Sequence, residues 1–194
     1  YCADHQIKCF WLEHDRVGRW LTHNPWLKKL KAHSHDAMTI CVSELSKKLY
    51  TRMGWSPERV VAIPNGIAPN RFARIERTMR SYGEPLQLGC VARLSADKGV
   101  DVLIKAMEPL PNTRLTIIGK GPEAQKLRTF IDKKGLSDRV KLVQKVEDLG
   151  AFYQTIDALV LPSRHHDPFG LVAAEAMLLG TPTVVTDACG IAGY

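Results

Sequence analysis

Apolar runs and amphipathic segments alternate along the chain from residue 86 onward. In the segment 100–110, Val100, Leu103, Ile104 and Met107 follow the i, i+3, i+4, i+7 spacing of a half-buried helix. The alternation predicts strands at 86–92, 114–118, 140–143, 158–161 and 183–186, and helices at 100–110, 123–134, 148–155 and 170–179. Strands that alternate with helices build a parallel sheet, so we predict an α/β fold with helices on both faces of that sheet.

The chain before residue 86 predicts a separate unit. We expect strand-forming sequence over 1–12, a strand at 37–42, a helix at 44–53 capped by Ser43, and a strand at 60–63. Residues 71–85 mix charged, Gly and Pro residues with little periodicity, as an interdomain linker would. We therefore place a domain boundary between residues 75 and 76. Because the chain starts at Tyr1 inside a strand-like region, we expect it to be a piece of a longer protein.

A predicted strand-to-helix turn carries the strongest chemical pattern, the segment Asp167 to Met177. The first turn of a helix presents backbone N–H groups and the positive end of the peptide dipoles, which suits a diphosphate. Gly170 would let the backbone approach such a ligand closely. Glu175 lies about one and a half turns into the helix, and its carboxylate could accept from two hydroxyls of a sugar. The pattern predicts a phosphate-binding turn with a carboxylate on each side.

A second loop brings cations to the same predicted edge of the sheet. Arg93 and Lys98 follow the strand 86–92, and together they could neutralise a diphosphate without a metal ion. Without the predicted phosphate-binding turn nearby, this loop would indicate only a surface arginine and a surface lysine beside the start of a helix. The nearby segment Gly119-Lys120-Gly121-Pro122 is a weak signal, because any tight strand-to-helix turn favours Gly-x-Gly.

Histidines offer further candidates. His14 ends an aromatic-rich strand beside Asp15 and could polarise a substrate hydroxyl, although a lone histidine is more often an ordinary surface residue. The groups His33 with His35, and His165, His166 and Asp167, could be read as metal ligands. Neither has both a recognised spacing and a companion cluster, so we predict no metal site.

Charge and composition narrow the partners. The net charge of +7 and pI of about 9.2 indicate an anionic partner, which could be a nucleic acid, an acidic membrane or a phosphorylated small molecule. Residues 16–31 interleave basic and apolar residues, as in a membrane-surface helix or in an ordinary helix with a solvated basic face. The sequence has no apolar run of about 18 residues, and its five scattered cysteines argue against a disulfide framework. We expect a cytoplasmic protein that could contact the membrane peripherally.

Taken in order, several short runs resemble the family-4 retaining glycosyltransferases of GT-B fold, from the end of their N-terminal domain through most of their nucleotide-binding domain. The matching runs are Val42-Ser43-Glu44, Ile63-Pro64-Asn65-Gly66-Ile67 with Phe72, Arg93-Leu94 with Lys98-Gly99, Ile118-Gly119-Lys120-Gly121-Pro122, and Asp167 to Met177 through Thr186-Asp187. The resemblance implies that residues 1–75 are a remnant of the acceptor-side domain and that 76–194 are an incomplete Rossmann-like domain for the donor.

The resemblance also implies roles for single residues. Arg93 and Lys98 would hold the donor diphosphate, and the backbone of Phe169, Gly170 and Leu171 would contact phosphate and sugar. Glu175 would take the ribose hydroxyls, Val146 would meet the nucleobase, and His14 would lie near the transferred sugar. Asp167 corresponds to a family glutamate that binds hydroxyls of that sugar. Two further departures from the family pattern are Ala92 and Gln144, each in place of a glycine.

The sequence therefore predicts a metal-free glycosyltransferase. It would move a sugar, with retention of configuration, from a nucleoside-diphosphate sugar to a glycan or lipid-linked acceptor in polysaccharide biosynthesis. The 194-residue chain alone would have little activity. The alternatives are a sugar-nucleotide epimerase or phosphorylase of the same fold, and a non-catalytic module that binds nucleotide sugars or nucleic acid. The chain carries no nucleic-acid-binding motif, so we expect no nucleic-acid partner.

Overall fold

The structure is a computed structural model of the chain, and it describes residues 5, 7–15, 19–73, 81 and 83–194. Its contacts divide the chain into two compact units. The first holds the described residues up to Gly66 together with His166–Phe169 and Asp187–Tyr194. The second holds Ile67–His165 and Gly170–Thr186. The chain therefore leaves the second unit twice near its end and returns to the first.

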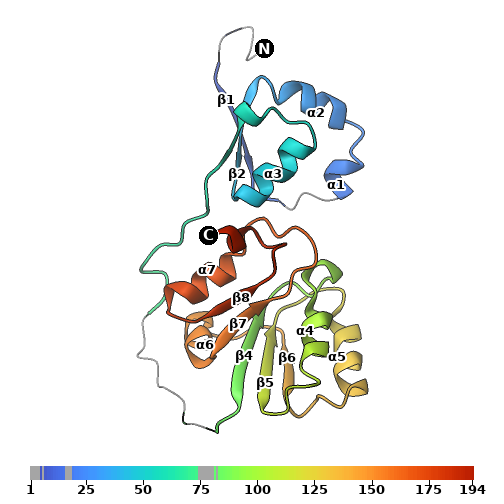
Figure 1. Cartoon of the computed structure of the whole chain (residues 1–194), viewed down its shortest axis with the longest axis vertical. Helices are drawn as coiled ribbons and strands as arrows, with labels where there is room; N and C mark the ends of the chain where they lie inside the picture. Colours follow the sequence, from blue (N-terminus) through green and yellow to red (C-terminus); the bar gives the residue numbers. More distant parts are fainter. Residues whose placement is uncertain (1–4, 6, 16–18, 74–80, 82) are drawn as a thin grey trace. The chain divides into compact units, whose positions relative to one another are not determined.

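The second unit is a five-stranded parallel sheet. Its strands lie in the order β6-β5-β4-β7-β8, and a helix connects each strand to the next one along the chain (Figure 1). The predicted α/β fold is confirmed. The strands are β4 (Leu86–Val91), β5 (Thr113–Ile118), β6 (Val140–Val143), β7 (Ala158–Leu161) and β8 (Thr183–Val185). The helices are α4 (Val100–Ala106), α5 (Ala124–Lys133), α6 (Leu149–Thr155) and α7 (Leu171–Leu178), with a 3₁₀ turn η2 (Ala96–Lys98) before α4.

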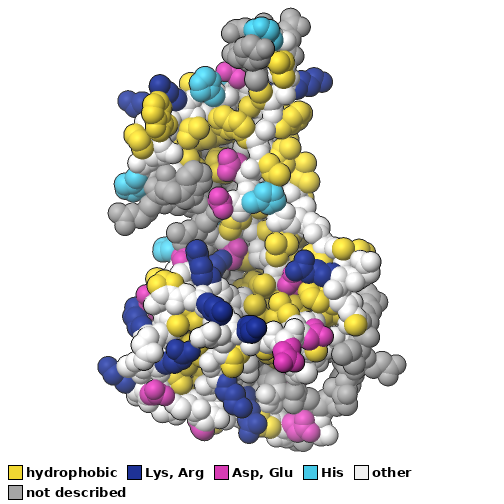
Figure 2. Space-filling view, turned by 180° about the vertical axis from the view of Figure 1, so that it is seen from behind, with side chains coloured by type: hydrophobic (Ala, Val, Ile, Leu, Met, Phe, Trp, Pro, Cys, Tyr) yellow, Lys and Arg dark blue, Asp and Glu magenta, His cyan; other side chains and the backbone are white. Residues whose placement is uncertain are grey.

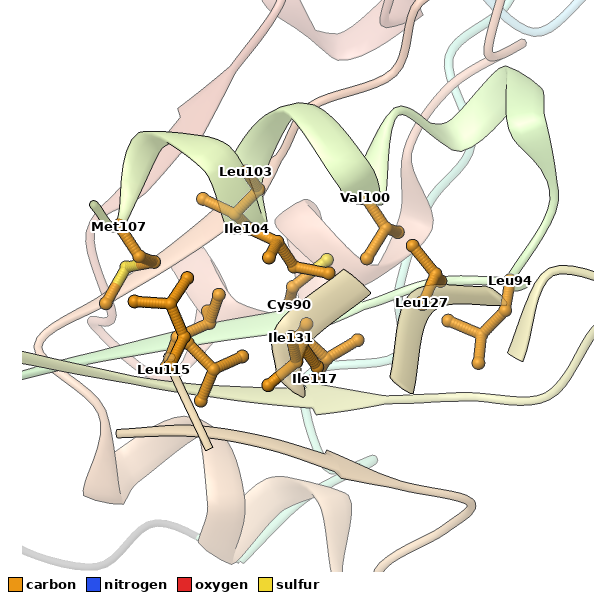
Figure 3. Close-up of a cluster of buried hydrophobic side chains, with 12 residues drawn as sticks. Cys90, Leu94, Val100, Leu103, Ile104, Met107, Leu115, Ile117, Leu127 and Ile131 are labelled. Atoms are coloured by element: carbon orange, nitrogen blue, oxygen red, sulfur yellow. The ribbon is translucent and has the colours of Figure 1, made fainter. Parts of the chain in front are cut away.

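One face of this sheet packs against α4 and α5 (Figure 3). The predicted apolar stripe of α4 is buried, with Ile104 and Met107 fully enclosed against Leu115 and Ile117 of β5. Burying each such side chain contributes about 1.5–3 kcal/mol, which is why a helix as short as α4 holds its place.

The opposite face packs against α6 and α7, which lie on the other side of the sheet in Figure 1. The approach is close at β4, because a Cβ built on Gly89 would lie 2.4 Å from Ile156 Cδ1 and 2.9 Å from Phe152 Cζ. Glycine at this position lets the C-terminal part of α6 settle against the strand. Both faces are therefore covered at β4, as the alternation of elements predicts.

The first unit has a three-stranded parallel sheet in the order β1-β2-β3. Ser43 caps α3 as predicted, since its hydroxyl oxygen accepts from the backbone N–H of Ser46 at 3.1 Å. Tyr50 and Trp55 are buried in the apolar core, with their ring centroids 5.2 Å apart. The elements are β1 (Cys9–Glu13), α1 (Arg19–Thr22), α2 (Leu27–His33), β2 (Ala37–Cys41), α3 (Glu44–Arg52), η1 (Pro57–Arg59), β3 (Val60–Ala62) and, near the end of the chain, η3 (Gly190–Gly193).

The structure differs from the sequence prediction in the basic segment 16–31. A single amphipathic helix is the wrong interpretation of this segment, because α1 ends at Thr22 and α2 begins at Leu27. The N–H of Leu27 donates to Asn24, and Lys29 Nζ lies 4.4 Å from the ring centre of Trp26. Residues 16–18 lie outside the described residues. Within the part of the chain that is described, no helix is long and apolar enough to cross a membrane.

The two compact units are not continuous along the chain. The predicted boundary between residues 75 and 76 falls among residues 74–80, which the structure does not describe, and it stays a prediction. Residues 166–169 and 187–194 come late in the chain, and their contacts place them in the first unit.

Two cysteine thiols give a first testable prediction. Burial raises the pKa of both Cys41 and Cys90 to about 12, so at pH 8 their thiolate fraction is roughly a thousandth of that of an ordinary thiol. We expect both to resist iodoacetamide in the folded protein and to react fully in denaturant, as measured by mass spectrometry of the alkylated peptides. Labelling of either thiol at equal rates in the two conditions would contradict this.

Candidate functional site

The strand order reverses between β4 and β7, and this reversal locates a candidate site. β4 is followed in sequence by strands on one side of it, β5 and then β6, whereas the chain after α6 crosses to β7 on its other side. In open α/β sheets, ligands bind beyond the carboxyl ends of the strands at such a point. The loops that leave β4 and β7 here are residues 92–99 and 162–170.

These two loops lie in contact. The backbone N–H of Arg164 donates to the carbonyl of Asp97 at 2.8 Å, and the N–H of His165 donates to the same carbonyl at 3.4 Å. Gly99 has a φ of +63°, and a Cβ placed on it would lie 2.0 Å from the carbonyl oxygen of Pro162. Only glycine combines this backbone conformation with this close approach. The loop with Arg93 and Lys98 is thereby held against the loop that leads to α7.

Arg93 and Lys98 differ in their surroundings. The side chain of Arg93 is 65% exposed, and its guanidinium lies 3.8 Å from the Asp97 carboxylate, a weak surface pair. Such a pair leaves the guanidinium able to meet an anion. Lys98 is half-buried at the end of η2, directly before Gly99. Both side chains come from the loop beyond β4, so the predicted cations lie at the point where the strand order reverses.

The predicted phosphate turn begins α7. Gly170 is the N-cap residue with a φ of +94°, a conformation that favours glycine, and its carbonyl accepts from the N–H of Ala173 at 2.9 Å. Leu171 opens the helix and is 45% exposed. A backbone N–H cluster at the start of a helix of this length attracts an anion.

Glu175 lies on α7 with only 6% of its side chain exposed. Its two oxygens have different partners within the second unit: Arg71 Nη2 lies 2.9 Å from Oε1, and the Tyr153 hydroxyl donates to Oε2 at 2.9 Å. Burial, and then the neighbouring Glu175 carboxylate, raise the pKa of Tyr153 well above its ordinary value. The phenol therefore stays protonated as a donor.

Sequence reasoning missed both partners of Glu175. Arg71 stands in the segment 71–85, which predicts an interdomain linker, and Tyr153 stands in the predicted helix 148–155, for which the sequence suggested no chemical role. A buried carboxylate requires a cation or several donors, which was the available signal. The sequence does not indicate which of the 27 Lys and Arg residues would supply the positive charge beside Glu175.

Val146, predicted near the nucleobase, is half-buried in the loop that joins β6 to α6. Asp148 closes this loop, since its carboxylate accepts from the N–H of Ala151 at 3.0 Å and caps α6. The loop leaves the same carboxyl edge of the sheet as the loops beyond β4 and β7.

His14, Asp167 and Phe169 belong to the first unit. His14 is exposed directly after β1. Two backbone hydrogen bonds of 2.8 Å fix Asp167. Its N–H donates to the carbonyl of Ala188, and its carbonyl accepts from the N–H of Gly190. Phe169 is 6% exposed and packs against Tyr194, with the centroids of the two rings 6.2 Å apart. The chain passes from the first unit to the second between Phe169 and Gly170, so the predicted site residues divide between the units.

The Gly119-x-Gly121 pair has a packing explanation. A Cβ on Gly121 would lie 2.3 Å from the carbonyl oxygen of Leu94, and one on Gly119 would lie 1.9 Å from that of Ala92. Both glycines therefore let the loop after β5 pass against the loop after β4. Within the described residues, no group of three His, Cys, Asp or Glu side chains could hold a metal ion. The absence of a metal requirement stays a prediction.

Comparison with known proteins adds to this geometry. Residues 72–194 match the family described as "Glycosyl transferases group 1". The chain belongs to this family. Its α/β fold is that of the GT-B glycosyltransferases, as the sequence resemblance implied.

The relatives of this glycosyltransferase chain have several activities. It is 30% identical over 158 residues to the exopolysaccharide phosphotransferase SCO2592 of Streptomyces coelicolor, covering 81% of the chain and 17% of that protein. It is 33% identical over 162 residues to a glycogen synthase of Mycobacterium tuberculosis, covering 80% and 38%. The crystal structure of Anabaena Alr3699/HepE in complex with UDP and glucose matches with a TM-score of 0.79 and 23% identity, covering 99% of the chain and 56% of that protein. The chain thus spans less than half the length of these two curated relatives.

Proposed function

We propose that this glycosyltransferase chain supplies the donor side of a family-4 enzyme, which moves a sugar from a nucleoside-diphosphate sugar to a glycan or lipid-linked acceptor with retention of configuration and without a metal ion. The observation that carries the proposal is the contact between the loops after β4 and β7, which brings two cations and the start of α7 to the point where the strand order reverses. The solved structure of Anabaena HepE with UDP and glucose supports a nucleotide-sugar donor.

The chemistry requires charge stabilisation at the diphosphate. When the bond from the anomeric carbon to the diphosphate oxygen breaks, its electron pair leaves with the nucleoside diphosphate. Arg93, Lys98 and the N–H groups at the start of α7 would stabilise that growing charge. The acceptor oxygen then bonds to the same face of the anomeric carbon, and its proton passes to the departing phosphate. In this proposal Asp167 and His14 contact the transferred sugar, and Val146 lies at the base.

Glu175 would bind the ribose in this proposal. We expect Glu175→Gln to weaken binding of the donor nucleotide by about 10- to 100-fold, the usual loss when a hydrogen bond to a charged group is weakened. Calorimetry on the full-length enzyme with UDP, GDP and ADP measures this and identifies the base. An exposed residue of α5, changed as Gln125→Glu, serves as the control and should bind as wild type.

A nucleotide-sugar turnover panel tests the reaction itself. Transfer to an acceptor, with the anomeric configuration of the product read by NMR, would support a retaining transferase. Interconversion of the donor sugar would instead identify an epimerase. Release of a sugar phosphate on addition of inorganic phosphate would identify a phosphorylase. Binding of an oligonucleotide without binding of any nucleotide would sink the proposal. On the face drawn in Figure 2, the described Lys and Arg side chains lie at several separate places.

A further inference from the structure

The buried carboxylate of Glu175 depends on a residue of the predicted linker. Its side chain is 6% exposed, and a carboxylate removed from water is costly unless it is paired. Among the described residues, Arg71 supplies the cation in contact with it, at 2.9 Å from Oε1, while Tyr153 donates to Oε2. The Arg71 side chain is 56% exposed, so it joins a buried anion to the solvent side.

Arg71 is held in this position by the residues that follow it. The ring of Phe72 meets Tyr153 edge-on, with centroids 6.1 Å apart, and Arg71 lies 5.4 Å from the Phe72 ring centre. A Cβ on Gly150 would lie 2.8 Å from Phe72 Cδ1, so glycine there admits the ring. The carbonyl of Ala73 accepts from the Gln154 side chain at 3.2 Å. Residues 71–73 are therefore docked on α6, next to the carboxylate on α7.

The two contacts do not use every acceptor position of the Glu175 carboxylate. An ionised carboxylate has about four acceptor positions on its two oxygens. Among the described residues, Arg71 and Tyr153 each use one of these positions, which leaves two for a pair of neighbouring hydroxyls. Because Arg71 need not leave for a diol to bind, its contact would orient the carboxylate and would not compete with the ligand.

We propose that Arg71 is a positioning residue for the donor, which holds the Glu175 carboxylate oriented to accept both hydroxyls of the donor's ribose. This rests on the proposed function, in which Glu175 is the ribose ligand. The start of the linker then belongs to the donor site, although it touches neither phosphate nor sugar. Its effect is specific to the ribose diol, which separates it from a general role in folding.

The test compares two nucleotides on the full-length enzyme. The probes are whichever of UDP, GDP and ADP binds wild type most tightly, and the 2′,3′-dideoxy form of the same nucleotide. We expect Arg71→Met to weaken binding of the ribonucleotide about tenfold by calorimetry and to leave the dideoxy form within about twofold. Arg71→Lys should restore part of the loss. The donor KM should rise with kcat nearly unchanged, since the ribose is remote from the bond that breaks.

Matched variants make each outcome decisive. Arg128→Met changes an exposed arginine of α5 in the same unit and should bind as wild type. Arg71→Met added to Glu175→Gln should weaken binding no further, because the two residues act through one contact. Unchanged or tighter binding by Arg71→Met, or an equal loss for both nucleotides, would overturn the inference. If Glu175→Gln itself leaves ribonucleotide affinity unchanged, the ribose assignment of the proposed function fails first, and the inference with it.

Discussion

We expect the removal of either cation from the loop after β4 to lower the kcat of the full-length enzyme by about 10²- to 10³-fold, which is the usual effect of deleting one preorganised donor at a developing negative charge. The variants are Arg93→Met and Lys98→Met, which keep much of the side-chain length and remove the charge. The effect falls mainly on kcat because the charge on the diphosphate grows as its bond to the sugar breaks. Steady-state kinetics with the nucleotide sugar that the wild-type enzyme uses measure the loss of kcat.

Two comparisons separate this effect from a loss of structure. Lys105→Met removes an exposed cation of α4 in the same unit and should keep wild-type kcat. Affinity for the nucleoside monophosphate should fall less than affinity for the diphosphate, since the cations are assigned to the diphosphate. Arg93→Met and Lys98→Met enzymes that both turn over within about twofold of wild type would show that the diphosphate is stabilised elsewhere.

Local patterns were sufficient to predict most elements of the second unit. The strand 140–143 has its predicted bounds, and the stripe of α4 is buried as its spacing indicates. The helix predicted at 100–110 ends earlier, at Ala106. Pro109 disfavours helical backbone at Glu108, and the carbonyls of Met107 and Leu110 accept from the Arg139 guanidinium at 2.7 and 2.6 Å. The effect of Pro109 can be predicted from the sequence, whereas Arg139 lies 29 or more residues away along the chain and its contact cannot.

Long-range contacts limited what the sequence could predict of the site. The turn at Gly170 and the cations beyond β4 could be placed, because carboxyl ends of parallel strands meet at one edge. The partner of Glu175 is Arg71, more than a hundred positions earlier, and no periodicity links them. The last residues of the chain belong to the first unit, where the Tyr194 hydroxyl accepts from the backbone N–H of Glu44 at 3.3 Å. Both features depend on how distant segments meet, which spacing along the chain does not encode.

The contact between the two loops can be tested through one methyl group. Gly99→Ala places a Cβ 2.0 Å from the Pro162 carbonyl oxygen, so the backbone of one loop must move. Backbone strain at a φ of +63° and overpacking against a main-chain atom together cost about 3 kcal/mol or more in the free energy of unfolding. Moving the loop also displaces Lys98, its neighbour, so we expect donor affinity to fall with stability.

Gly135→Ala is the control that isolates the contact. Gly135 has a φ of +64°, and a Cβ there would meet no atom within 4 Å, so this change imposes the same backbone strain without the clash. It should cost about 1 kcal/mol and leave nucleotide affinity unchanged. Denaturant unfolding and calorimetry of both variants give the comparison. Equal losses of stability in the two would mean that backbone strain alone accounts for Gly99, and that the loops after β4 and β7 can separate at little cost.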